Sequence, residues 1–238
     1  MSQHQRYQQQ FRDPVAVGRG RTQASGREKF IVRTYNHLFL AILAFAGIEA
    51  GLFMTGLNVP IYQLFAGNWM IVMGAFVITG MLASGAAHRA ESLSTQYLAL
   101  AGYVVAEALI FVPILTIAST VAPGAIPSAG MVTILGFAAL TAVVFYTRKD
   151  FSFLRGVVMF GGLLALVAIA AAWIFNFALG VWFSVAMVGL AGASILFNTS
   201  NVMREYPEDR YVGAALSLFA SVAMLFFYIL RIFLAARD

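Results

Sequence analysis

Long apolar stretches alternate with short polar connections along most of the chain, and this pattern is the main structural signal in the sequence. A helix needs about 20 mainly apolar residues to cross the hydrocarbon core of a membrane. Seven windows meet this requirement, and they cover residues 36–57, 69–87, 96–118, 130–147, 156–175, 178–198 and 212–234. The sequence therefore predicts an all-α polytopic membrane protein, a bundle of seven transmembrane helices.

The charged residues lie on alternate connections, which predicts the orientation of the chain. The connections 58–68, 119–129 and 175–177 carry no charge, whereas the N-terminal segment and the other connections carry nearly all of the Lys and Arg residues. Basic residues are enriched on the cytoplasmic side of membrane proteins. We therefore expect the N-terminus in the cytoplasm and, with seven spans, the C-terminus outside. A six-span chain with a re-entrant last segment is the alternative.

Residues 1–35 differ from the rest of the chain, since they are rich in Gln and Arg and contain no long apolar run. Segments of this composition do not bury enough apolar surface to fold alone. We expect a disordered, basic cytoplasmic tail over residues 1–35 and a transmembrane domain over residues 36–238. An organellar presequence is the alternative, because acidic residues are scarce.

Composition narrows the chemistry that the chain supports. The chain is 61% hydrophobic and 11% charged, with no cysteine and three histidines. A soluble domain has about a quarter charged residues, so lipid is the expected surrounding. Thiol chemistry is excluded, and neither a metal site nor a catalytic or nucleotide-binding motif is recognisable. We expect no enzymatic activity, no cofactor and no nucleic-acid partner, since the basic residues follow membrane topology.

Two acidic residues interrupt the predicted spans: Glu49 lies in the first and Glu107 in the third. At 1.5 Å per residue, both are expected about 15–18 Å into the membrane, near its midplane. Ionisable residues at that depth are costly and are candidates for an ion pathway or a pH sensor. Neutral carboxyl groups that hydrogen-bond to a helix backbone are the structural alternative.

Three stretches in the last third of the chain resemble the Bax inhibitor-1 family, also called the transmembrane Bax-inhibitor-motif family. They are RKDFSFL at 148–154, LFNTSN at 196–201, and Glu208-Asp209 followed by ALSLF at 215–219 and LFFYILR at 225–231. The resemblance implies a bundle in which the seventh span is central and the other six surround it. It also implies a bacterial inner membrane, with an organellar membrane as the alternative.

The resemblance further implies a site between spans six and seven. Family members are associated with a pH-sensitive Ca²⁺ leak, in which an aspartate that ends span six shares a proton with one in span seven, and an arginine near the end of span two acts as a latch. The matching positions are Asn198, Ser221 and, for the latch, Arg89. Asn198 and Ser221 do not ionise near neutral pH. We therefore expect an Asn198–Ser221 hydrogen bond in place of the acid pair.

Two functions are consistent with this resemblance. The first is a Ca²⁺ leak whose pH switch is altered or lost, with Glu49, Glu107, Asn198 and Ser221 as the ion-pathway or pH-sensing candidates, because hard cations take oxygen ligands. The second is a non-transporting regulator or accessory subunit that binds another membrane complex, such as an AAA protease, as some bacterial relatives do. The basic tail suits an acidic protein partner, and it suits anionic lipid equally.

Overall fold

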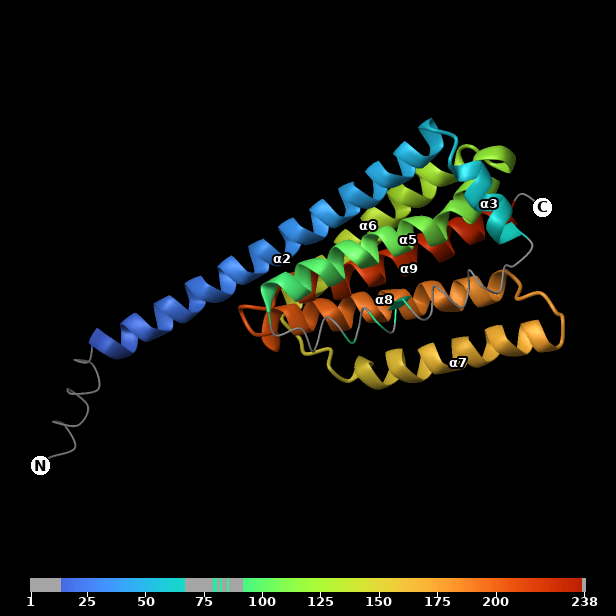
Figure 1. The fold of residues 1–238 in the computed structure, drawn as a ribbon. Coiled ribbons are helices and arrows are strands. Elements are labelled where there is room, and N and C mark those ends of the chain that lie inside the picture. The colour runs from blue at the N-terminus through green and yellow to red at the C-terminus, as the bar shows by residue number, and fades with distance from the viewer. Residues whose placement is uncertain (1–13, 67–78, 81, 83–84, 86–91, 237–238) are drawn as a thin grey trace, which may run out of the picture.

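The computed structural model describes residues 14–66, 79, 80, 82, 85 and 92–236, with side chains in the first helix described from residue 26 onward. All regular structure in these residues is helical (Figure 1). The helices are α2 (Pro14–Met54), α3 (Asn58–Ala66), α5 (Leu93–Val121), α6 (Ala125–Thr147), α7 (Leu154–Ile174), α8 (Val181–Arg204) and α9 (Tyr211–Ala235). Six of them, all except the short α3, are long and apolar enough to cross a membrane.

These six helices match six of the seven predicted spans and confirm a polytopic helical membrane protein. The remaining window, 69–87, lies outside the described residues apart from positions 79, 80, 82 and 85, which are helical. The short helix α3 occupies the uncharged connection after the first span, where the amide nitrogen of Asn58 donates a 3.3 Å hydrogen bond to Thr116 Oγ1 of α5.

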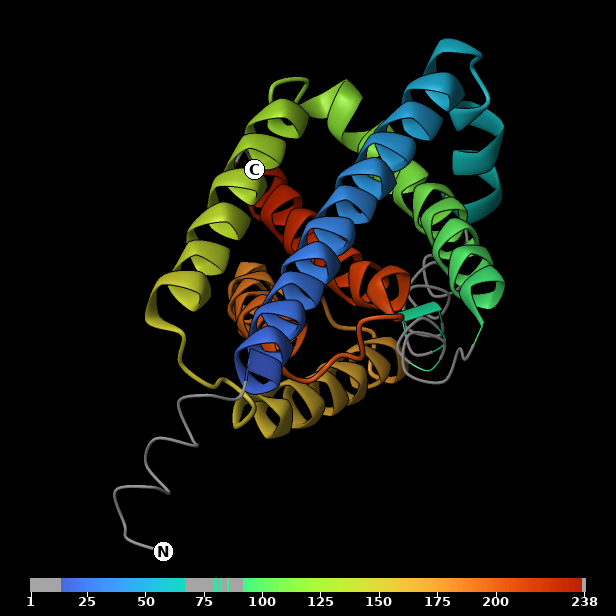
Figure 2. The ribbon, with the colours of Figure 1, turned by 90° about the vertical axis from the view of Figure 1, so that its left-hand side faces the viewer.

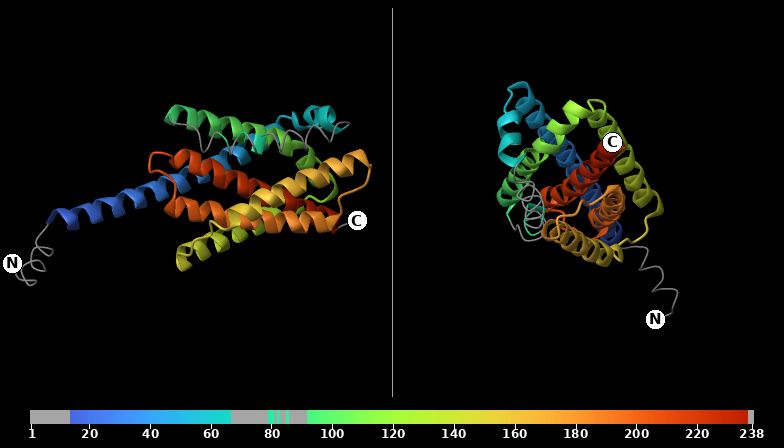
Figure 3. Two further views of the ribbon diagram at one scale, coloured as in Figure 1. Left: turned by 90° about the horizontal axis from the view of Figure 1, so that it is seen from below. Right: turned by 90° about the vertical axis from the view of Figure 1, so that its right-hand side faces the viewer.

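Helix α9 lies in the middle of the bundle. It packs against α2, α5, α6 and α8, and Figures 2 and 3 show it enclosed by these helices when the bundle is viewed along its length. Most of its residues are buried on all sides, as expected of a helix that is hydrophobic all round. The central position that the family resemblance implies for the last span is confirmed.

Helix α7 is the most peripheral of the six long helices. It packs chiefly against α8 (Figure 1), and within Leu154–Ile174 the structure buries Ala165 alone. The exposed side chains of α7 are apolar and include Phe160 and Leu163. In a polytopic helical protein, apolar surface of this extent belongs against lipid.

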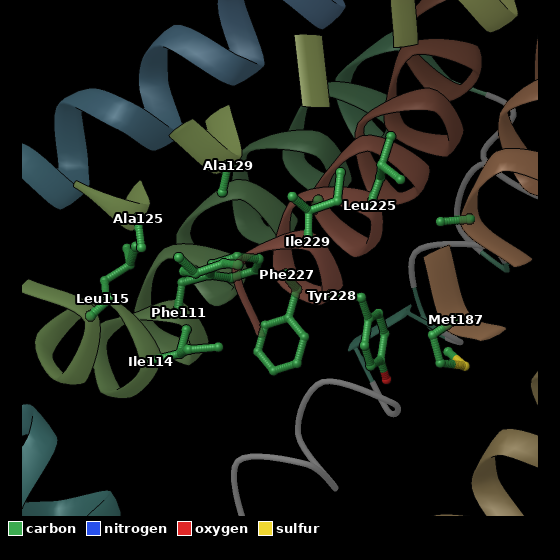
Figure 4. Packing of buried hydrophobic residues seen from close by; sticks show 14 of the residues in the cluster. Phe111, Ile114, Leu115, Ala125, Ala129, Met187, Leu225, Phe227, Tyr228 and Ile229 are labelled. Carbon is green, nitrogen blue, oxygen red and sulfur yellow. The ribbon is translucent and has the colours of Figure 1, made fainter. Parts of the chain in front are cut away.

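Two clusters of buried side chains fix α5 along the whole of α9. In the first cluster, the ring of Phe111 meets Phe227 edge-on at 5.5 Å (Figure 4). The Phe111 ring also stacks parallel to the ring of Phe226 at 5.7 Å. In the second, Tyr103 meets Phe219 edge-on at 5.9 Å. Each aromatic pair of this kind adds about 0.5–1.5 kcal/mol beyond the area that it buries.

Helix α2 begins earlier than the sequence predicts. It has 41 residues, which at 1.5 Å per residue makes it about 60 Å long, twice the thickness of the hydrocarbon core. The predicted boundary between tail and bundle at residue 35 falls inside this helix, and Phe30 and Thr34 are already buried. The basic residues around them interrupt the apolar window and so conceal the helix. Figure 1 shows the N-terminal part of α2 projecting beyond the other helices.

Candidate functional site

The charged residues gather at one end of the bundle, which we call the charged end; it comprises residues 26–33 of α2, the α6–α7 connection 148–153 and the α8–α9 loop 205–210 (Figure 1). Backbone groups hold these segments together. The amide of Phe151 donates a 3.1 Å hydrogen bond to Ser200 Oγ of α8, and the Arg204 guanidinium donates to the Arg148 carbonyl. The connections at the opposite end carry no charge.

Asn198 of α8 and Ser221 of α9 meet where the two helices pack. The amide nitrogen of Asn198 donates a 2.9 Å hydrogen bond to Ser221 Oγ. It also lies 3.3 Å from Ser194 Oγ and 3.3 Å from the Ser217 carbonyl oxygen. The hydroxyls of Ser194 and Ser221 are 2.8 Å apart. We call Ser194, Asn198, Ser217 and Ser221 the polar ladder, and it contains the hydrogen bond that the sequence predicts.

The spacing of its residues places each half of the polar ladder on one face of its helix. Ser194 and Asn198 are four residues apart on α8, as are Ser217 and Ser221 on α9, so each pair lies on one helix face. A carbonyl only accepts hydrogen bonds, and therefore the amide nitrogen of Asn198 faces Ser217. None of the four side chains ionises near neutral pH, so the ladder holds α8 against α9 without a shared proton. Hydrogen bonds between membrane helices contribute about 0.6 kcal/mol each.

Tyr206 extends the polar ladder toward the charged end. Its hydroxyl lies 2.9 Å from Ser217 Oγ, and its side chain is buried although the residue belongs to the α8–α9 loop. Burial raises the pKa of Tyr206, so the phenol stays neutral and free to donate. Tyr206 also lines a cavity of about 140 Å³ together with Asn201, Glu205, Pro207 and Arg210.

The two carboxyl groups predicted within the spans belong to α2 and α5, not to the helices α8 and α9 that form the ladder. Glu107 sits at the middle of α5, 14 residues from either end, as the sequence predicts. Glu49 lies five residues before the end of α2 at Met54, about 8 Å from that end at 1.5 Å per residue. Within α2 it is therefore close to the uncharged end of the bundle. Both side chains are buried.

Neither carboxyl group has a hydrogen-bond partner among the described residues. The Tyr103 hydroxyl, one turn earlier on α5, lies near the Glu107 carboxyl without reaching hydrogen-bond geometry. In the part of the chain that the structure describes, no group of three His, Cys, Asp or Glu side chains converges on a point where a metal would bind. The latch candidate Arg89 lies outside the described residues.

Gln96 of α5 is a buried polar residue that sequence reasoning missed. Its Oε1 accepts a 3.1 Å hydrogen bond from the Gly213 amide, and its Nε2 donates at 3.4 Å to the Asp209 carbonyl. The first amides of a helix have no hydrogen-bond partner within that helix. Gln96 therefore supplies the acceptor for one of the first amides of α9, that of Gly213. Its signal in the sequence is an amide side chain at the edge of an apolar window.

Arg27 of α2 was also missed. Its Nε donates a 3.0 Å hydrogen bond to the Met203 carbonyl, and its Nη1 donates to the Tyr206 carbonyl. The guanidinium lies over the Phe30 ring at 4.9 Å. Side-chain patterns carry no signal for such contacts, because the partners are backbone carbonyls.

The chain is similar in sequence to several known proteins. Escherichia coli YccA, named a modulator of FtsH protease, is 35% identical over 108 residues, which are 44% of this chain and 49% of YccA. Arabidopsis thaliana LIFEGUARD 4 is 36% identical over 117 residues, 46% of each chain. A Pseudomonas aeruginosa protein is 37% identical over 109 residues, 45% of this chain and 49% of that protein.

The chain spans about half the length of the curated relatives that it matches. The family model covers far more of it, since residues 27–238 match the family described as "Inhibitor of apoptosis-promoting Bax1". This match includes all six long helices from residue 27 onward and the whole polar ladder. The chain therefore belongs to the Bax inhibitor-1 family.

Proposed function

We propose that the protein is a modulator of a membrane-bound protease of the FtsH type, and that it acts by direct contact without moving ions. The observation that carries this proposal is the polar ladder. The leak mechanism requires an ionisable pair where this chain has a neutral Asn198–Ser221 hydrogen bond. The similarity to YccA, named a modulator of FtsH protease, supports the same function.

The proposed location is a bacterial inner membrane, with the N-terminus and the charged end in the cytoplasm. The positive-inside rule supports this orientation, since the basic connections all fall on that side. A second Escherichia coli relative, 35% identical over 108 residues, is named an inner membrane protein. A cytoplasmic charged end also places the projecting part of α2 where a cytoplasmic domain of a protease has access to it.

The projecting part of α2 is the proposed contact with the protease. It carries Arg19 and Arg21, and Lys29 and Arg33 follow where the helix joins the bundle. The basic residues of this segment suit an acidic protein surface, because opposite charges speed association, and a backbone that is already helical loses less entropy on binding than a random coil does.

Reconstitution with an FtsH-type protease tests this proposal. The full chain is incorporated with the protease into liposomes, and the rate of degradation of a membrane substrate is measured. We expect the protein to slow degradation several-fold, and Arg19→Glu with Arg21→Glu to remove most of that effect. Arg237→Glu, a charge reversal at the other end of the chain, is the matched control. An unchanged degradation rate with the folded, membrane-inserted protein would contradict the proposal.

A cation leak is the second candidate, because one observation favours it. The Glu49 and Glu107 carboxyl groups are buried and have no hydrogen-bond partner among the described residues, and such groups are suited to bind a cation or a proton. Ca²⁺ flux into liposomes that contain the protein alone, measured between pH 6 and 8, separates the two functions. We expect no flux. A flux that Glu49→Gln and Glu107→Gln abolish would establish the leak instead.

A further inference from the structure

One arginine joins α2 to the loop between α8 and α9, and the proposed contact with a protease does not require it. The Arg27 guanidinium donates to the carbonyls of Met203, at 3.0 Å from Nε, and of Tyr206. Met203 lies in the last turn of α8, where carbonyl groups have no partner within the helix. The negative end of the helix dipole favours a cation at this position.

A second contact brings the loop against the residue before Arg27. The carboxylate of Glu208 lies so close to Gly26 that a Cβ added there would be 2.5 Å from one of its oxygens. The Nη2 atom of Arg27 is buried, and no described group accepts a hydrogen bond from it. Two consecutive residues of α2 therefore contact the α8–α9 loop: Gly26 at Glu208, and Arg27 at the Tyr206 carbonyl.

The same loop residue connects Arg27 to the polar ladder. The carbonyl of Tyr206 accepts from Arg27, while its hydroxyl pairs with Ser217 Oγ at 2.9 Å. The Ser217 carbonyl in turn accepts from Asn198. A displacement of the loop away from α2 therefore pulls on the end of the ladder, because the loop is short and both groups belong to one residue.

We propose that Arg27 is a positioning residue that couples the projecting part of α2 to the polar ladder. While Arg27 binds the two carbonyls, the loop 205–210 is closed against α2 and Tyr206 holds Ser217. When a contact on the projecting part turns or pulls α2, Arg27 releases the loop, and the Tyr206–Ser217 hydrogen bond opens with it. The coupling does not depend on whether the partner of the projecting part is a protease.

The distance between α2 and the loop tests the first half of this coupling. The chain has no cysteine, so Glu28→Cys and Asp209→Cys, both at exposed positions, accept spin labels without background labelling. In lipid nanodiscs we expect one narrow distribution of the distance between the two labels when Arg27 is present. Arg27→Ala should add a longer, broader population, and Arg27→Lys a smaller one, because lysine reaches only one carbonyl. Lys29→Ala is the matched control and should leave the distribution unchanged.

Hydrogen exchange in the first two turns of α9 tests the second half. Loss of a charged hydrogen bond corresponds to a change of roughly tenfold in a local opening equilibrium, so Arg27→Ala should raise exchange at residues 212–217 about tenfold. Tyr206→Phe should raise exchange by itself but add little to Arg27→Ala, because both act through one loop. A narrow distance distribution in Arg27→Ala, or additive effects of the two substitutions, would overturn the coupling. If Arg27→Ala does not fold, Arg27→Lys supports the same two measurements.

Discussion

The bundle contains two kinds of buried polar group: one has hydrogen-bond partners, and the other has none among the described residues. In the polar ladder, the Asn198 amide nitrogen, the Ser194 hydroxyl and the Ser221 hydroxyl all have partners on α8 or α9. The carboxyl groups of Glu49 and Glu107 are as deeply buried but have none among the described residues. A buried polar group without a partner costs about 1–3 kcal/mol. The ladder therefore stabilises the contact between α8 and α9, whereas the two carboxyl groups lower the stability of the bundle.

Of the substitutions that test this difference, Asn198→Leu should change the stability of the protein most. It removes the donor that serves Ser194, Ser217 and Ser221 and forces a branched apolar side chain into the contact between α8 and α9. We expect a loss of about 3 kcal/mol, measured as a lower Tm by tryptophan fluorescence in detergent. Phe160→Leu on the exposed face of α7 is the control. A Tm equal to that of the wild type would show that the ladder does not stabilise the bundle.

Replacement of Glu107 by leucine should raise the stability of the protein, whereas replacement of Asn198 lowers it. Leucine there removes a buried carboxyl group that has no described partner, and apolar replacement of such groups is neutral or stabilises by about 1–2 kcal/mol. A higher Tm for Glu107→Leu than for wild type is the expected result. Gln96→Leu, at an equally buried residue of α5 whose hydrogen bonds are satisfied, should lower Tm. A loss of stability in Glu107→Leu would instead indicate that a bound cation or water holds the carboxyl group, and would favour the leak.

Some features of the fold and of the candidate site could be predicted from the sequence, and others could not. Six spans were predictable because apolar windows of the right length have a direct geometric consequence. The Asn198–Ser221 hydrogen bond was predictable only from the family resemblance, which places both residues at one site. The start of α2 was not predictable, because its basic residues are compatible with both a helix and a tail. Arg27 and Gln96 were missed because they bind backbone groups, whose positions depend on how distant segments pack.

Asp150 offers a third case, an exposed carboxylate that does have a partner, and the smallest expected effect. Its Oδ1 accepts a 2.8 Å hydrogen bond from the Ser152 amide. The hydrogen bonds from Ser152, with a smaller contribution from Arg204, hold the pKa of Asp150 below its ordinary value. In the unfolded chain the pKa of an Asp is about 3.9, and in the folded protein the pKa of Asp150 is lower. The contact therefore stabilises the folded protein fully above about pH 3.9. The contribution is lost as the pH falls through the lower, folded-state value.

The Tm difference between wild type and Asp150→Ala should therefore stay constant from pH 7 down to about pH 4 and shrink below it. Because Asp150 is fully exposed, the difference should be far smaller than those at Asn198 and Glu107. Asp150→Asn, which keeps an acceptor for the Ser152 amide but does not titrate, should retain part of the stabilisation at every pH. A Tm difference that grows below pH 4 would contradict the assignment. It would mean that the charge of Asp150 opposes folding, so that an exposed carboxylate at the charged end resembles the buried ones rather than the ladder.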